Sequence, residues 1–138
     1  MKKDDCIFCK IAAGEIPSKT LYEDDKYRVV MDLGPATEGH SLILPKDHFA
    51  NLYELDAETA AGVLPLASKI ANAMKDALGC DGLNLVQNNG EAAGQTVMHF
   101  HLHVIPRYAG KKQVIQWTPG NPTSEEMEAT ADKIRAKL

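Results

Sequence analysis

The chain contains the stretch Val97-Met98-His99-Phe100-His101-Leu102-His103-Val104-Ile105-Pro106, in which three of its five histidines stand at alternate positions. A β-strand turns successive side chains to opposite faces, so a strand here would place all three imidazoles on one face, about 6.5–7 Å apart. At that spacing they could share one small ligand. The residues between the histidines would face an apolar core: Phe100, Leu102 and Val104.

Two simpler interpretations of this stretch stay open. The histidines could form a packing or surface ladder, or a metal site of the His-x-His type. A catalytic site is favoured over both, because buried imidazoles are costly to desolvate without a role. A loop with two glycines, residues 88–96, also stands directly before the histidines.

The composition is that of one folded domain over residues 1–138. The chain has 44% hydrophobic and 25% charged residues, and its formal net charge of −4 argues against binding a nucleic acid polymer. A single bound nucleotide remains compatible with that charge. No apolar run has the length of a membrane span, and the first residues do not form a signal-peptide core. We therefore expect a cytoplasmic protein without a membrane partner.

Working outward from the histidines, hydrophobic spacing and turn residues predict the other elements. We expect strands over residues 20–23, 27–32, 41–44 and 83–86, and a long helix from its cap at Asp56 to Gly79. Short helices are expected over residues 6–12, capped by Asp5, and after Thr123 or Ser124. Pro65 should kink or reseat the long helix. Its expected buried positions are Ala60, Val63, Leu64, Ala67, Ile70, Ala71 and Met74. The order of elements predicts an α+β fold with helices on one side of an antiparallel sheet.

Cys6 and Cys9 form a Cys-x-x-Cys pair near the N-terminus. The pair supplies two soft ligands of the four that a structural zinc ion takes, usually from Cys and His. A redox pair and two plain buried cysteines are the alternatives. The odd cysteine count in a chain expected to be cytoplasmic speaks against a disulfide framework.

Four separate segments together resemble the histidine triad (HIT) superfamily. Residues 99–105 fit its His-φ-His-φ-His-φ-φ signature, where φ is apolar, and residues 39–48 and 88–96 are similar to its upstream segments. Residues 6–11 and 14–17 resemble the start of bacterial Hint-like nucleotide hydrolases with a Cys-x-x-Cys zinc motif. The resemblance runs from Cys6 to about Arg107. It implies a five-stranded antiparallel sheet with one long and two shorter helices, a core over residues 6–107, a C-terminal loop and helix over 108–138, and a homodimer.

The resemblance also implies roles for individual residues. His101 corresponds to the nucleophile, which attacks the α-phosphate and forms a nucleotidyl-histidine intermediate. His103 would contact the phosphate and help the leaving group depart, and His40 would orient the cluster. The phosphate would be held by Asn88, Gly94, Gln95 and Thr96, and the ribose by Asp32. The base would lie among Phe8, Ile11, Val30 and Leu33. Taken alone, His40 and Asp32 could be ordinary residues at strand ends, and the four apolar residues could be plain core.

The zinc ligands that the resemblance implies are Cys6, Cys9, His48 and His99. Such an ion would be structural, and the reaction would need no catalytic metal. A metalloenzyme that uses the three alternating histidines as zinc ligands is a different hypothesis. It predicts that a chelator stops activity at once.

The third histidine of the triad bears on the reaction. Nucleotidyl transferases of the superfamily carry glutamine where this chain has His103, so the resemblance favours hydrolysis. Within the hydrolases we expect a purine nucleoside phosphoramidase acting on AMP derivatives. The alternative substrate class is a dinucleoside polyphosphate. An alternative of another kind is a regulatory protein that binds AMP without turning it over.

Overall fold

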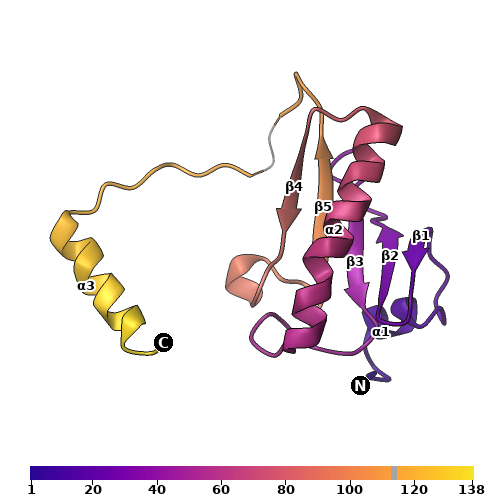
Figure 1. Ribbon diagram of the computed structural model, residues 1–138, viewed down its shortest axis with the longest axis horizontal. Helices are drawn as coiled ribbons and strands as arrows, with labels where there is room; N and C mark the ends of the chain where they lie inside the picture. The colour runs from indigo at the N-terminus through magenta and orange to yellow at the C-terminus, as the bar shows by residue number, and fades with distance from the viewer. Residues whose placement is uncertain (113–114) are drawn as a thin grey trace.

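The computed structural model describes residues 1–112 and 115–138, and in them the chain builds one five-stranded sheet (Figure 1). The strands stand in the order β1-β2-β3-β5-β4, and every neighbouring pair is antiparallel. Their bounds are β1 Thr20–Glu23, β2 Tyr27–Met31, β3 Ser41–Pro45, β4 Gly82–Val86 and β5 Leu102–Arg107. The helices are α1 Ile7–Ala12, α2 Ala57–Leu78 and α3 Ser124–Arg135, with a 3₁₀ turn, η1, at Glu91–Ala93. The predicted five-stranded sheet with one long and two shorter helices is confirmed.

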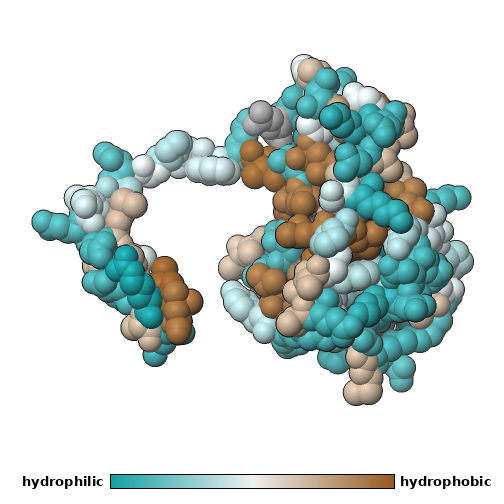
Figure 2. Space-filling model, in the orientation of Figure 1, coloured by the Kyte–Doolittle hydropathy of each residue, from teal (hydrophilic) through white to brown (hydrophobic). Residues whose placement is uncertain are grey.

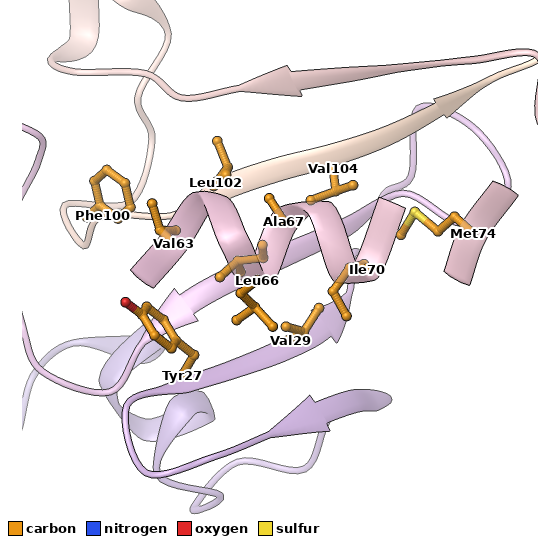
Figure 3. Packing of buried hydrophobic residues seen from close by; sticks show 11 residues of the cluster. Tyr27, Val29, Val63, Leu66, Ala67, Ile70, Met74, Phe100, Leu102 and Val104 are labelled. Carbon is orange, nitrogen blue, oxygen red and sulfur yellow. The ribbon is translucent and has the colours of Figure 1, made fainter. Parts of the chain in front are cut away.

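The sheet is covered on both faces, so the expectation of helices on one side is wrong. On one face, side chains of β2, β3 and β5 pack against α2, as Figure 3 shows for Val29, Val104 and Ile70. On the other face, Val30, Leu42 and Leu44 pack against α1. The reason lies in β3, whose five residues are all buried. A central strand that is apolar on both sides needs a helix over each.

Helix α2 has the ends that the sequence predicts. The Asp56 carboxylate accepts a hydrogen bond from the Thr59 N–H at 2.8 Å, and Gly79 closes the helix in the left-handed conformation with φ 62°. The helix continues through Pro65 without a break. Among the expected positions, Leu64 is 60% exposed and Ala60 and Ala71 are half-buried, whereas Leu66, which was not expected, is buried. The true stripe is Thr59, Val63, Leu66, Ala67, Ile70 and Met74.

The segment that carries the histidines is only partly a strand. β5 begins at Leu102, and residues 97–99 bend before it. The alternation still sends Phe100, Leu102 and Val104 into the core under α2. The histidines on the other side belong to two different sites, as described below.

The two shorter helices differ in their setting. α1 is capped by Cys6, whose Sγ accepts from the Cys9 N–H at 3.4 Å, and not by Asp5 as expected. α3 is capped by Thr123, and Figure 1 shows it apart from the sheet. Its Met127 and Ile134 are 60% and 58% exposed. Among the described residues, no helix combines the length and the apolar character needed to cross a membrane.

Candidate active site and metal site

A pocket of 560 Å³ opens beside α1, where β2, β5 and the loop after β4 meet. It collects side chains from four separate parts of the chain. The expected nucleotide-binding residues that line it are Phe8, Ile11, Val30, Asp32, Leu33, Asn88, Gly94, Thr96, His101 and His103. The sheet register explains part of this grouping, because β3 pairs Leu42 with His103 and so joins the two halves of the pocket.

His101 presents one free ring nitrogen in this pocket. Its Nδ1 lies 2.7 Å from the backbone carbonyl oxygen of His99. A carbonyl can only accept, so Nδ1 carries the proton and Nε2 keeps its lone pair. The ring is 7% exposed and meets the edge of Phe8 at a centroid distance of 4.9 Å. Burial lowers the pKa of His101, which favours the neutral, nucleophilic imidazole.

His40 and His103 form a hydrogen-bonded pair with a defined order of donors. The N–H of Ala36 donates to His40 Nδ1 at 2.9 Å, so the His40 proton is on Nε2. That Nε2–H donates to His103 Nδ1 at 2.9 Å, and the proton of His103 is therefore on its own Nε2. Asp32 Oδ2 lies 3.5 Å from the same His40 nitrogen. His103 thus offers a donor in the pocket, 5.0 Å from His101 between ring centroids.

Both histidines of this pair are neutral near pH 7. Burial first, and then the nearby His101 and His40, lower the pKa of His103 to about 4. Burial also lowers the pKa of His40, although the Asp32 carboxylate opposes that shift. The pair is therefore a neutral hydrogen-bonded unit.

The low pKa of His103 predicts acid instability. Between pH 6.5 and about 4, the unfolded chain binds a proton at this imidazole while the folded chain does not. The free energy of unfolding should therefore fall as the pH falls through that window. Urea titrations at pH 7, 6 and 5 should show a smaller loss for His103→Gln than for the wild type. Equal losses in the two proteins would contradict the assignment.

The loop before β5 differs from expectation at Gln95. This side chain is 3% exposed, and its amide is used up by the backbone: Nε2 donates to the carbonyls of Ala50 and Val97, and Oε1 accepts from the Gly90 N–H. It closes the loop and does not line the pocket. Gly94, with φ 92°, and Thr96 are the loop residues at the pocket wall.

Sequence reasoning missed several apolar and polar residues of the pocket wall. The sequence contains features that could have indicated some of them. Ile16 and Pro17 belong to the stretch already singled out before β1, and Leu42 alternates with the core residue Ile43 on β3. Lys19 lies beside Met31, whose N–H donates to its carbonyl at 2.9 Å. The full set missed is Ile7, Ile16, Pro17, Ser18, Lys19, Met31 and Leu42.

The first histidine of the triad lies with Cys6, Cys9 and His48, the set that the family resemblance implies for zinc, and not with His101 and His103 as strand alternation alone suggested. Because the chain bends at residues 97–99, the fully buried His99 turns toward Cys6 and Cys9. Its Nδ1 lies 3.5 Å from Cys6 Sγ and 3.4 Å from Cys9 Sγ. His48 Nδ1 lies 3.4 Å from Cys9 Sγ. The four donor atoms are all within 4.8 Å of one another.

This cluster fits a tetrahedral zinc ion. With Zn–S near 2.3 Å and Zn–N near 2.05 Å, sulfur and nitrogen ligands stand about 3.6 Å apart. The S–N distances found are 3.4–3.5 Å. The tautomer of His99 also fits, since its Nε2–H donates to the Pro45 carbonyl at 2.9 Å and leaves the Nδ1 lone pair for a metal.

Comparison with known proteins identifies the family of this chain. A sequence model of the HIT domain matches residues 13–110. The chain belongs to the HIT family.

Two curated HIT-family relatives show how far the similarity extends. The chain is 48% identical over 105 residues to protein hit of Bacillus subtilis. This match covers 76% of this chain and 72% of the relative. It is 38% identical over 134 residues to adenosine 5'-monophosphoramidase hnt1 of Schizosaccharomyces pombe. This match covers 96% of this chain and 98% of the relative.

Solved HIT structures extend the comparison to three dimensions. The structure of SMU.412c from Streptococcus mutans has 40% identity and a TM-score of 0.93, over 99% of this chain and 87% of that one. A Zn-bound histidine triad family protein from Mycobacterium smegmatis has 36% identity and a TM-score of 0.75, over 97% of this chain and 98% of that one. The HIT fold of this chain is therefore shared along nearly its whole length.

Proposed function

We propose that this HIT-family chain is a nucleotide hydrolase that cleaves purine nucleoside phosphoramidates at the α-phosphate. One observation carries the proposal: the His101 Nδ1–H bond to the His99 carbonyl leaves an Nε2 lone pair in the pocket, beside the His103 donor. A neutral imidazole held this way is a competent nucleophile toward phosphorus. The relative named adenosine 5'-monophosphoramidase supports the choice of a P–N substrate.

The pocket offers a place for each part of a nucleotide. Phe8, Ile11 and Val30 form an apolar wall for the base, and Leu33, which is 92% exposed, would lose water-exposed surface when a base covers it. The Asp32 carboxylate can accept from the ribose hydroxyls, while Asn88, Gly94 and Thr96 would hold the phosphate. The position of AMP in a crystal of the complex tests these three assignments.

The reaction would proceed in two steps. In the first, His101 Nε2 forms a bond to phosphorus, the P–N bond breaks, and the amine leaves with the electron pair. In the second, water attacks the nucleotidyl-histidine and frees His101. His103 Nε2–H supplies the proton that leaves with the amine in the first step, and the water that attacks in the second step returns a proton to His103 and leaves its hydroxyl on phosphorus. His103 Nε2–H donates toward the phosphoryl oxygen or the leaving atom and stabilises the charge that develops there.

A comparison of two substrates tests the proposal. We expect a higher kcat/KM for adenosine 5'-phosphoramidate than for a diadenosine polyphosphate. The reverse order would favour a dinucleoside polyphosphate hydrolase with the same residues. Binding of AMP without turnover of either substrate would favour a regulatory nucleotide-binding protein. Instant loss of activity on adding a chelator would favour the metalloenzyme hypothesis.

We propose that the Cys6–Cys9–His48–His99 cluster holds a structural zinc ion. The fit of its donor atoms and the Zn-bound relative support this assignment. The bound ion would tie the N-terminal segment to the residues before β5. All the groups given a chemical role above belong to the other cluster, and so the proposed reaction needs no catalytic metal.

We also propose that the chain forms a homodimer. β4 stands at the end of the sheet order, and Leu85 on it is 42% exposed. Figure 2 shows hydrophobic residues gathered where α2 and β4 lie. Leu64 on α2 is 60% exposed. An unpaired apolar edge strand favours pairing with a second copy. The cytoplasmic location and the division into a core and a tail stay predictions.

Sedimentation should measure the dimer directly. We expect twice the 15.1 kDa chain mass for the wild type. Leu85→Lys should shift the protein toward the single chain, because a lysine on an edge strand opposes pairing. A wild type that sediments as one chain at all concentrations would contradict the proposal.

A further inference from the structure

The tautomer of His40 is set from one side by the backbone of a loop, and from the other by the Asp32 carboxylate, whose Oδ2 lies 3.5 Å from His40 Nε2. The N–H that donates to His40 Nδ1 belongs to Ala36, in the loop formed by residues 33–39. This loop carries no regular secondary structure of its own. Its position therefore depends on what fastens it to the rest of the fold.

Two hydrogen bonds fasten the loop to the end of β5. Thr37 Oγ1 donates to the Pro106 carbonyl at 2.6 Å, and the Tyr108 hydroxyl donates to the Glu38 carbonyl at 2.8 Å. The loop also turns back on itself, because the His40 N–H donates to the Thr37 carbonyl at 3.2 Å. The two hydrogen bonds thus hold Thr37 and Glu38, the residues that directly follow Ala36 in the loop.

At Gly39, the loop is packed closely against the end of α2 and against β5. At Gly39, whose φ is 94°, an added Cβ would lie 2.6 Å from Leu78 Cδ1 and 3.1 Å from Pro106 Cγ. The backbone is therefore in close contact with the end of α2 and with β5. The two hydrogen bonds act on a segment that is already seated against the body of the protein.

We propose that Thr37 and Tyr108 are positioning residues for the His40–His103 pair. The proposal rests on the proposed function, in which His103 donates toward the leaving group. If the loop loosens, the Ala36 N–H no longer selects the His40 tautomer. The pair can then reverse, with His103 Nδ1–H donating to His40 Nε2, and the Asp32 carboxylate at 3.5 Å is the contact that still opposes this reversal. His103 Nε2 would become an acceptor in the pocket and could not stabilise a leaving nitrogen.

The variants that test this are Thr37→Val and Tyr108→Phe, alone and together. Thr37→Ser keeps the hydroxyl and should restore wild-type behaviour. Tyr53→Phe is the matched control, since the Tyr53 side chain is 84% exposed. All variants are compared for thermal unfolding, so that a loss of folding is seen separately.

Two readouts are needed, and one of them does not depend on activity. The first is the ¹⁵N NMR spectrum of the imidazole nitrogens of His40 and His103 in the free protein, which reports the tautomer. The second is kcat for adenosine 5'-phosphoramidate and for an aryl ester of AMP. An amine is a poor leaving group and needs the donor, whereas a phenol leaves readily without it. We expect the double variant to lose about 10-fold in kcat on the amide and much less on the ester, with KM unchanged, because the His103 donor acts on the leaving group.

The outcomes separate this inference from the proposed function. Unchanged ¹⁵N shifts in the double variant, or equal losses on both substrates, would overturn the positioning role. A reversed tautomer in the double variant would support the positioning role even if the wild type turned over neither substrate. Absence of turnover by the wild type would contradict only the proposed function. Failure of Thr37→Ser to restore the wild-type spectrum would also count against the role of the Thr37 hydroxyl.

Discussion

Replacing His101 with alanine should lower kcat for adenosine 5'-phosphoramidate by about 10⁴-fold or more, because it removes the group that would bond to phosphorus. The remaining pocket would still hold the nucleotide, since its other lining residues, among them Ile11, Val30 and Asp32, are unchanged. We therefore expect the affinity for AMP to change little. The result would assign the covalent step to the histidine whose Nδ1 is held by the His99 carbonyl.

Rapid quenching should detect this step in the wild type. A nucleotidyl-protein species should form during turnover of the wild type and be absent in His101→Ala. His103→Gln is the informative comparison: it keeps the nucleophile, so the species should still form, more slowly. Turnover by His101→Ala within 10-fold of the wild type would show that another group performs the attack, and the proposed mechanism would be wrong.

Replacing Cys9 with serine should remove the metal and destabilise the whole domain. The wild type should contain about one zinc ion per chain and the variant almost none, since the site has four ligands and needs its thiolates. Loss of the ion would leave the buried Cys9–His99 region without its central contact. We expect about 3 kcal/mol less stability and a fall in Tm of about 10 °C.

Cys80→Ser is the control for this experiment, because Cys80 is half-buried and is not part of the metal cluster. It should keep both the zinc content and the Tm of the wild type. Zinc content comes from elemental analysis and Tm from calorimetry. If the wild-type protein contained no zinc after purification with equimolar zinc, the proposed zinc site would be contradicted. At a temperature where Cys9→Ser is still folded, hydrolysis should persist at a reduced rate, in contrast to a catalytic metal.

Some features of this protein follow from local sequence alone. The alternation of Phe100, Leu102 and Val104 predicted which side of the histidine segment enters the core, because a period of two fixes the face whichever residue begins the strand. Asp56 and Gly79 predicted both ends of α2, since capping depends on a few neighbouring backbone groups. The triad motif, together with the segments at residues 6–17, 39–48 and 88–96, identified the family, which the HIT-domain match confirms.

Other features required contacts between distant segments. Alternation by itself predicted one face for all three histidines, and only the family resemblance assigned His99 to zinc. In the structure a bend at residues 97–99 places His99 beside Cys6 and Cys9 and leaves His101 and His103 in the pocket. Gln95 is polar and next to the triad, so sequence favoured a phosphate donor. Its amide is instead consumed by the carbonyls of Ala50 and Val97.

The sequence by itself determined the family, the faces of the elements and the residue types available for chemistry. The tertiary structure alone decided which ring nitrogens carry protons. The tautomer of a histidine depends on the partner that its other nitrogen meets, and here the partners are backbone groups: the His99 carbonyl for His101 and the Ala36 N–H for His40. Every residue carries such groups, so nothing in the order of side chains reveals them. Only the path of the folded chain brings a donor to one imidazole and an acceptor to another.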